Sequence, residues 1–284
     1  MKPPKFLTLV LLTSFCSNLA LASWGDNLKN TAIPITANGK TTNNYHIIAL
    51  DYKNPKFTEK LINIKTAKLK GLSYYNSPTG LNFPYNQRLH GSSDDIYLRK
   101  TVTKKLKQVN EYLKPYKLNV FILDGFRSYK LQNELWQFFL NYAKTNHPNF
   151  SKAQCEDFAA NYCSNPQDFS IHNDLTWFTH STGASVDLTL QSTKTGELAY
   201  MGGIFDDPNE ISHTCYYENN PINNLSSLLA QQNRRILYNA MIKAGFTNYS
   251  FEWWHYDWGN QMWLMNLKDY AKVKGAFYGA CLKP

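Results

Sequence analysis

The sequence predicts an α+β fold with a central, at least partly antiparallel sheet flanked by helices. Helical and β-prone segments follow one another in a mixed order, without the repeating strand–helix alternation of a parallel sheet. The turn residues 193–196 lie between two β-prone runs and predict a hairpin, whose two strands are antiparallel. No internal repeat or linker divides residues 23–284, so we expect a single domain.

Residues 1–22 have the features of a secretory signal peptide. Two lysines precede the apolar residues 6–15, and Ala20-Leu21-Ala22 fits a small-residue cleavage site. The apolar run is too short to cross a bilayer, and no later segment approaches the length of about eighteen apolar residues that a membrane span needs. We therefore expect cleavage after Ala22, export to the periplasm or the medium, and no stable membrane insertion.

The mature chain is moderately basic. The formal net charge is +9 for the whole sequence, and the loss of Lys2 and Lys5 with the signal peptide lowers it to +7. Since no long run of like charges occurs, the excess predicts a diffuse, solvated surface. A basic excess is compatible with an anionic cell wall or membrane surface as a partner, whereas nucleic-acid binding is not predicted. No feature of the sequence indicates an oligomeric state.

Periodicity places the helices and strands. Val102, Leu106, Val109 and Leu113 recur at helical spacing, which predicts an amphipathic helix over 96–113. The other predicted elements, in chain order, are a loose polar leader (23–44), β-prone runs (45–51 and 61–64), an ordered loop rich in Pro and Gly (74–85), a buried strand (118–123) and turn (124–128), a second helix (131–142), an irregular excursion (149–179), a strand (184–190) in a hairpin with 197–200, a helix (224–244) and a strand (249–256).

Four cysteines remain after the predicted cleavage. In an exported protein an even set predicts two disulfides, for which three pairings exist. Proximity in the sequence favours Cys155 with Cys163, which leaves Cys215 with Cys281 to tie down the C-terminal tail. A cysteine-rich zinc site is the rival interpretation, but no C-x-x-C spacing supports it.

Two segments carry the residue types of a hydrolytic metal centre. His180 and Asp187 lie in a stretch of small residues, and Glu252 and His255 follow about seventy residues downstream. Two imidazoles and one carboxylate form a three-ligand set that leaves a position open for water, and the spare carboxylate can act as a base. We predict one Zn2+ per chain, bound on the sheet by His180, Asp187 and His255, with Glu252 as the general base.

Each histidine alone is more often an ordinary core or surface residue, and the pairing of the two segments is what favours a metal site. One geometric difficulty remains in this interpretation. On a regular strand Glu252 and His255 would face opposite sides, so a bend or bulge is needed there. The bulky Trp253 and Trp254 could stabilise such a bend. Arg127, in the turn after a predicted buried strand, could stabilise a developing oxyanion, although arginines in turns usually lie at the surface.

Several segments share a pattern with a known family. They are 124–127 (DGFR), 179–190 (THSTGASVDLTL), 195–198 (TGEL), 201–206 (MGGIFD), 233–235 (NRR) and 249–256 (YSFEWWHY), with 78–80 (PTG) as a weaker match. In this order they resemble the segments of zinc D-alanyl-D-alanine dipeptidases, the enzymes of vancomycin-resistance operons and their chromosomal relatives. The resemblance covers roughly residues 60–257.

The resemblance implies roles for individual residues. The three predicted ligands would hold zinc, and Glu252 would act as base toward the attacking water. Arg127 would stabilise the tetrahedral oxyanion, and Asp206 would help to bind the free ammonium of a dipeptide. The family's small, enclosed pocket implies a dipeptide substrate.

The sequence also departs from the family pattern. Phe178 and Thr179 stand where small serines commonly precede the first ligand, and Phe126 and Ser128 differ from the usual tyrosine and proline. The cysteine-bearing insertion 149–179 and the tail after Trp258 are longer than expected. These departures leave the metal chemistry intact and leave open whether dipeptides are the only substrates.

The leading hypothesis is an exported zinc metallopeptidase that hydrolyses D-alanyl-D-alanine or related D-dipeptides, with metal-bound water as the nucleophile. The nearest alternative is a D,D- or L,D-carboxypeptidase or endopeptidase that acts on peptidoglycan stem peptides. A non-catalytic zinc module that binds cell-wall peptides is a second alternative, which the presence of Glu252 and Arg127 disfavours. A secreted hydrolase that attacks a neighbour's wall would use the same chemistry.

Overall fold

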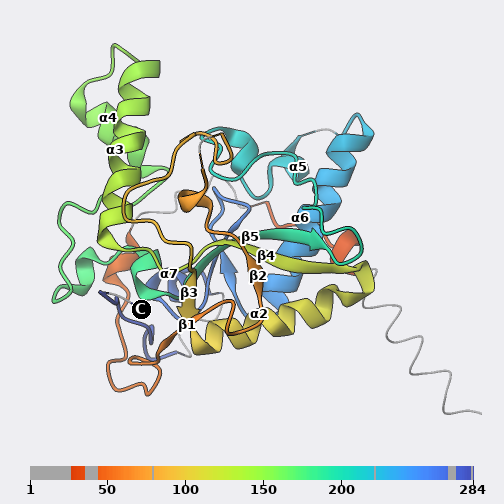
Figure 1. The fold of residues 1–284 in the computed structure, drawn as a ribbon, viewed down its shortest axis with the longest axis horizontal. Helices are drawn as coiled ribbons and strands as arrows, with labels where there is room; N and C mark the ends of the chain where they lie inside the picture. The colour runs from red at the N-terminus through yellow and green to blue at the C-terminus, as the bar shows by residue number, and fades with distance from the viewer. Residues whose placement is uncertain (1–26, 36–43, 79, 221, 268–272, 283) are drawn as a thin grey trace, which may run out of the picture.

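The central element is a five-stranded mixed sheet with the strand order β2-β4-β5-β7-β6 (Figure 1). β2 runs parallel to β4, and the other neighbouring strands are antiparallel. A separate antiparallel pair, β1 with β3, lies beside helix α2. The strands are β1 (Leu61–Asn63), β2 (Lys70–Gly71), β3 (Tyr97–Arg99), β4 (Leu118–Asp124), β5 (Ser185–Ser192), β6 (Thr247–Asn248) and β7 (His255–Asp257).

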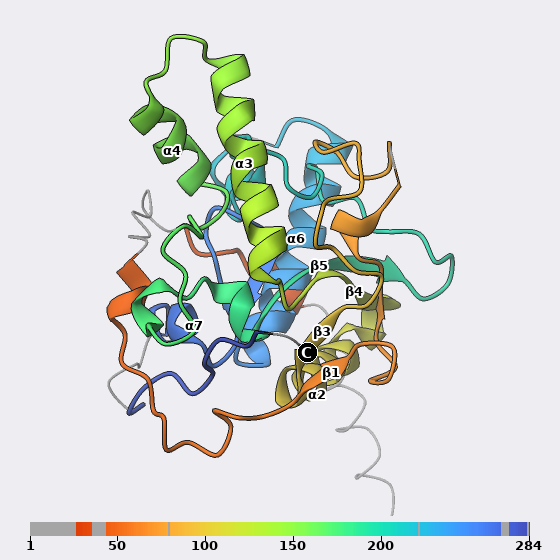
Figure 2. The same ribbon diagram turned by 60° about the vertical axis from the view of Figure 1, so that its left-hand side comes forward.

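Helices pack on this sheet and also extend away from it. α2 contacts both β4 and α6, whereas α3 and α4 form a hairpin that projects from the body of the molecule (Figures 1 and 2). The α-helices are α2 (Lys100–Leu113), α3 (Tyr129–Asn146), α4 (Lys152–Ala160), α5 (Tyr216–Asn219), α6 (Leu225–Lys243) and α7 (Gln261–Met265). The 3-10 helices are η1 (Asn44–Ile47), η2 (Tyr74–Asn76), η3 (Lys114–Tyr116), η4 (Asp174–Thr176), η5 (Thr179–Thr182) and η6 (Glu210–Ser212).

The structure, a computed structural model, describes residues 27–35, 44–78, 80–220, 222–267, 273–282 and 284. The predicted signal peptide, residues 1–22, lies outside the described residues. Within the described ranges the chain forms one α+β domain, which confirms the predicted fold class. None of the helices described there is long and apolar enough to cross a membrane.

The most strongly periodic predictions are confirmed. The apolar stripe of α2 is fully buried, and the predicted strand 118–123 corresponds to β4, with Val120 and Ile122 in the core. α6 begins after Asn224, whose side chain accepts a hydrogen bond from the backbone N–H of Ser227, and it ends before Gly245 in a left-handed conformation. In each case a local signal, either spacing or a cap residue, coincides with the tertiary packing.

Two predictions for less periodic segments are wrong. Residues 45–51 contain η1 and a single bridge from Leu50 to Ala276 in place of a strand. The excursion 149–179 is not irregular throughout, because it contains α4, which begins with a capping box between Ser151 and Gln154. Few residues of α4 are buried, so its sequence lacks the apolar period that would have predicted it.

The leader is not uniformly loose. Leu28 and Ile33 are buried, and the side chain of Asn239 on α6 donates hydrogen bonds to the backbone oxygens of Leu28 and Thr31. The described part of the leader, residues 27–35, therefore packs against the domain. The remainder of the predicted leader that precedes and follows it lies largely outside the described residues.

The predicted disulfides are not present, since all four described cysteines are free. Cys155 lies in α4, and the chain continues in helical turns to Cys163. Eight residues of helix rise about 12 Å, which exceeds the span of about 7 Å that a disulfide allows between Cα atoms. The Cys281 thiol instead accepts a hydrogen bond from the Arg99 guanidinium at 2.9 Å, and the Cys215 thiol accepts one from Asn219 at 3.4 Å.

Candidate metal centre

Strand register brings together ligands that are far apart in the sequence. Asp187 on β5 lies directly opposite His255, the first residue of β7. His180 lies in η5, which two residues separate from β5, and the backbone N–H of Arg127 donates to its carbonyl oxygen. Gly183 ends η5 with a positive φ of 66°, and a side chain there would collide with Leu61. A short 3-10 turn therefore returns the first histidine to the two strands that carry the other ligands.

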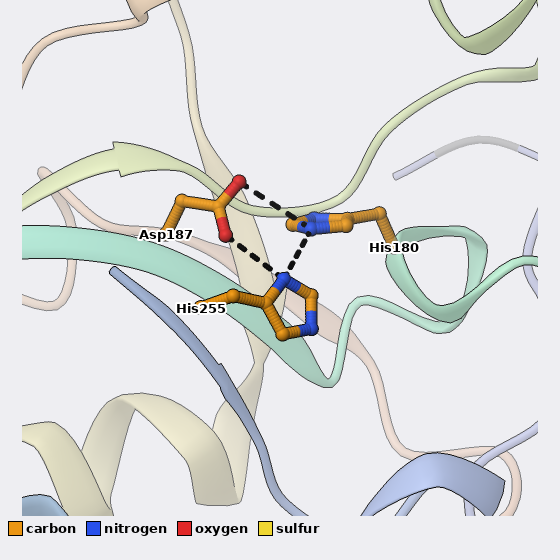
Figure 3. Close-up of side chains that lie close together, drawn as sticks. All are labelled: His180, Asp187 and His255. Atoms are coloured by element: carbon orange, nitrogen blue, oxygen red, sulfur yellow. Dashed lines mark hydrogen bonds and ion pairs between the residues drawn. The ribbon is translucent and has the colours of Figure 1, made fainter. Parts of the chain in front are cut away.

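The three side chains point toward one another in the core (Figure 3). His180 Nε2 lies 3.2 Å from His255 Nδ1 and 3.4 Å from one Asp187 carboxylate oxygen. The other Asp187 oxygen is 3.0 Å from His255 Nδ1. All three residues are at most 5% exposed. They form a compact group of potential ligand atoms, as the sequence predicted.

The outward nitrogen of each imidazole has a hydrogen-bond acceptor. His180 Nδ1 lies 2.7 Å from the carbonyl oxygen of Gly125, and His255 Nε2 lies 3.0 Å from a carboxylate oxygen of Asp257. Donation to these acceptors leaves the inward nitrogens as lone pairs that face each other and the Asp187 carboxylate. Three electron-rich atoms at these distances repel one another unless a cation lies between them, so the donor set fits a bound metal ion.

The electrostatics also favour a cation. Burial raises the pKa of Asp187, but the two neighbouring imidazoles outweigh it and hold this pKa well below its usual value. Burial lowers the pKa of His255, whereas the carboxylates of Asp257 and Asp187 together raise it well above its usual value. The buried centre therefore has a strongly negative potential that either a proton or a metal ion can neutralise.

Glu252 reaches the centre from a hairpin loop. The predicted strand 249–256 is wrong, because β6 and β7 pair as a hairpin and residues 249–254 form the loop between them. The backbone N–H of Glu252 donates to Tyr249, and that of His255 donates to Glu252, so this segment turns twice. The alternation of a regular strand does not apply, and one carboxylate oxygen of Glu252 lies 3.7 Å from His255 Nδ1. The bend that the metal site requires is this loop.

The protonation state of Glu252 depends on its surroundings. Burial is the largest cause that raises the pKa of this carboxyl, and the negative charges of Asp187 and Asp206 add to it against the opposing effect of His255. The resulting pKa is about 8 in the metal-free protein. Glu252 without a metal is therefore largely protonated at neutral pH. A divalent cation among the neighbouring ligands would lower this pKa and favour the carboxylate.

Arg127 is a buried residue, only 6% exposed, despite its position after a turn. Its Nε donates to Asp124 at 3.0 Å and its Nη1 to Gln132 at 3.0 Å. Its Nη2 donates to the Tyr75 hydroxyl at 3.1 Å and lies 3.5 Å from Asp187. These contacts fix a cationic guanidinium beside the metal ligands, where it can stabilise negative charge that develops on a substrate.

Asp206 lies on the same cavity from another segment. It has a positive φ of 57°, and its carboxylate accepts a hydrogen bond from the Tyr85 hydroxyl at 2.8 Å. Burial, together with the charge of Asp187, raises the pKa of Asp206 to about 7. A cationic group bound beside it would stabilise the charged form.

These side chains share one small cavity of about 50 Å³, which contains Arg127, Asp206, Glu252 and the three potential ligands in its wall. All six site residues predicted from the sequence therefore meet at one place. Residues 160–164, which include the last residue of the insertion helix α4 and the four residues after it, also line this cavity.

The residues that orient this group were not predicted from the sequence. Asp257 supports His255, Asp124 and Gln132 hold Arg127, and Tyr85 contacts Asp206. The only sequence signal was proximity, since Asp257 lies two residues after a predicted ligand and Asp124 three residues before Arg127. Tyr85 had no comparable signal beyond its place in an aromatic loop.

Comparison with known proteins gives a family match over most of the chain. A sequence model of the peptidase M15 family, described as D-ala-D-ala dipeptidase, matches residues 87–273. D-alanyl-D-alanine dipeptidases are similar over shorter segments. That of Enterococcus faecalis is 46% identical over 77 residues, which are 27% of this chain and 35% of the relative. That of Synechocystis is 35% identical over 116 residues, 38% of this chain and 46% of the relative.

A more distant relative extends the aligned region. The D-alanyl-D-alanine dipeptidase of Escherichia coli is 29% identical over 143 residues, which are 49% of this chain and 55% of the relative. The aligned parts thus span between 35% and 55% of the length of these relatives.

Among solved structures, a vancomycin-resistance D,D-pentapeptidase VanY in complex with Zn(II) has a TM-score of 0.32 at 14% identity, over 60% of this chain and 77% of that one. VanYB in complex with D-alanine-D-alanine also has a TM-score of 0.32, at 16% identity, over 65% and 82%.

Proposed function

Because the chain belongs to the peptidase M15 family of D-Ala-D-Ala dipeptidases, we propose that it is a zinc metallopeptidase that hydrolyses D-alanyl-D-alanine or a closely related D-dipeptide. One observation carries the proposal. The buried group of His180, Asp187 and His255 shares a small cavity with a carboxylate that can serve as a base and with a fixed guanidinium. Such a set suits hydrolysis of an amide bond.

The donor set favours zinc. Two imidazoles and one carboxylate are a common ligand set of catalytic zinc, and both imidazoles here have the outer acceptors that such ligands need. A zinc ion held by these residues supplies a Lewis acid and lowers the pKa of bound water towards neutrality.

The residues around the ligands have separate roles in proton transfer, charge stabilisation and substrate binding. Glu252 accepts a proton from the attacking water and then delivers it to the nitrogen of the leaving amine as the C–N bond breaks. The guanidinium of Arg127 stabilises the negative charge that develops on the carbonyl oxygen. Asp206, held by the Tyr85 hydroxyl, binds the free ammonium of the dipeptide and so positions the scissile bond.

Export is part of the proposal. The signal-peptide pattern of residues 1–22 supports a periplasmic or secreted location, where peptides derived from peptidoglycan metabolism occur. An exported protein whose mass corresponds to a chain beginning at Ser23 would support this location, and a cell-retained protein of full-length mass would contradict it.

The activity is tested by metal analysis combined with a substrate panel. The purified protein is expected to contain about one zinc per chain, and to cleave D-Ala-D-Ala but not L-Ala-L-Ala. Chelation should abolish this activity and added zinc should restore it. Cleavage of a stem pentapeptide without cleavage of the dipeptide would instead assign a carboxypeptidase. A zinc-loaded protein that cleaves none of these peptides would assign the non-catalytic binding module.

A further inference from the structure

A second, larger cavity lies next to the metal cavity. Its volume is about 340 Å³, and its wall includes Asp207, Glu210 and Phe251. Three residues, Asn161, Tyr162 and Glu252, line both this cavity and the metal cavity. The two spaces are therefore neighbours that share a wall.

Contacts at both ends of the side chain hold Tyr162 in this shared wall. It follows α4, and its ring stacks on Phe139 of α3 with a centroid distance of 5.1 Å and an interplanar angle of 24°. At the other end of the side chain, its hydroxyl donates to the carbonyl oxygen of Pro208 at 2.6 Å. The side chain thus links the α3–α4 hairpin to the segment that carries the two consecutive aspartates 206 and 207.

Those two aspartates lie on different sides of the wall. Asp206 lines the metal cavity, whereas Asp207 lines the second cavity. Burial chiefly raises the pKa of Tyr162, to about 12, and the nearby charges of Asp207 and Glu252 contribute to this increase. The phenol therefore lies within electrostatic range of Asp207, which lines the second cavity, and of Glu252, which lines both cavities.

The arrangement of the two cavities is relevant to the length of peptide that the metal cavity can bind. Under the proposed function, Asp206 binds the ammonium at the amino end of a dipeptide. A peptide with one more residue at that end would have to continue beyond Asp206, and the adjoining free volume is the second cavity. The hydrogen bond between Tyr162 and Pro208 lies at the shared wall, since Tyr162 lines both cavities and Pro208 lines the second.

We propose that Tyr162 is the specificity-determining residue that restricts the substrate to free dipeptides, by closing the metal cavity against the neighbouring cavity. When this wall is removed, the second cavity accepts the residue that precedes D-Ala-D-Ala in a longer peptide. The inference rests on the proposed function, because it assigns the position of the dipeptide's amino end.

The test compares D-Ala-D-Ala with a tripeptide that ends in D-Ala-D-Ala, using zinc-loaded wild-type protein and two variants. Tyr162→Ala should raise the ratio of tripeptide to dipeptide kcat/KM by at least about tenfold, because it removes both the ring and the hydrogen bond. Tyr162→Phe keeps the stacked ring and should raise the ratio about threefold, because it removes only the bond to Pro208.

Tyr142→Ala is the matched control. Tyr142 also lies on the α3–α4 hairpin and stacks on Phe158, but it lines neither of the two cavities. This variant should leave the substrate ratio unchanged, so a change there would mean that general loosening of the hairpin is the cause and would overturn the assignment.

The possible results distinguish a failure of the role assigned to Tyr162 from a failure of the proposed dipeptidase activity. A ratio that stays within about twofold of wild type in a folded, zinc-loaded Tyr162→Ala protein overturns the role of Tyr162 alone. If that variant does not fold, the same result for Tyr162→Phe decides the question. Wild-type protein that already cleaves the tripeptide as efficiently as the dipeptide also overturns it. Wild-type protein that is inactive on both peptides overturns the proposed function, and the inference with it.

Discussion

The two sides of the metal cavity are built differently. On one side, β5, β7 and η5 carry the potential ligands, and each imidazole has a hydrogen-bond acceptor behind it. On the other side, irregular segments carry groups that are proposed to orient or select the substrate. These are Tyr85 in the aromatic loop, Asp206 in a turn with positive φ, and Tyr162 after the end of α4.

The potential metal ligands thus lie on or beside paired strands, whereas the groups proposed to select the substrate lie on loops. A metal ligand must be held within a fraction of an ångström, which paired strands achieve because their register is set by many hydrogen bonds. Substrate contacts can vary in size and polarity without disturbing that register when they lie on loops. We therefore expect changes on the sheet side to affect metal affinity, and changes on the loop side to affect KM or substrate choice.

Glu252 lies between the two sides, and its substitution should have the largest effect. Glu252→Gln preserves the shape of the side chain but removes its ability to accept a proton, so kcat should fall about a thousandfold. Zinc content, measured by elemental analysis, should not change. The control is Glu210→Gln, since Glu210 lines only the second cavity. Near-normal turnover by the zinc-loaded Glu252→Gln variant would show that Glu252 is not the general base.

Asp257→Asn tests the sheet side. The Asp257 carboxylate accepts hydrogen bonds from Ser185 at 2.6 Å and Asn260 at 2.7 Å, and its other oxygen faces His255 Nε2. An amide that keeps the first two bonds presents its NH2 to His255. The imidazole proton is then displaced to Nδ1, where the metal should bind.

Zinc affinity should consequently fall about 10- to 100-fold in Asp257→Asn, as measured by competition with a chelating dye, while the KM of the fully loaded enzyme changes little. Asp168→Asn, at an exposed position, is the control. Unaltered zinc affinity in Asp257→Asn would show that the hydrogen bond between His255 and Asp257 does not affect zinc binding.

Tyr85→Phe tests the loop side and should have the smallest effect of the three. Loss of the hydroxyl that donates to Asp206 should raise the KM for the dipeptide about tenfold, since a hydrogen bond to a charged group contributes on the order of 1.5 kcal/mol. Zinc affinity should stay the same. Tyr74→Phe is the control, because its hydroxyl donates to the backbone of Phe83 within the same loop. A reduced zinc affinity in Tyr85→Phe would break the proposed separation of the two sides.

The regular helices and strands of the fold could be predicted from the sequence more readily than its loops. α2, β4 and α6 were predictable because their buried residues recur at the period of the element or because a cap residue marks an end. The segment 249–256 was not, because β-prone aromatic residues occur equally in a strand and in a loop that packs in the core. Only the pairing of β6 with β7 distinguishes these possibilities.

The candidate site was predictable to a similar extent. His180, Asp187, His255 and Glu252 could be identified because their residue types and order match one kind of chemistry and one family pattern. Asp257 and Asp124 could not, because a single acidic residue in a sequence is usually a solvated surface group. Their roles follow from burial against His255 and Arg127, which the folded chain creates.

The sequence by itself determined the fold class, the family and the residues suited to bind a metal, because these depend on residue type, spacing and order. The tertiary structure alone decided the turn that brings Glu252 to the ligands, the absence of disulfides among the described cysteines, and the wall at Tyr162. Each of these depends on distances between segments that are remote in the sequence, and such distances are set only when the strands pair and the core packs.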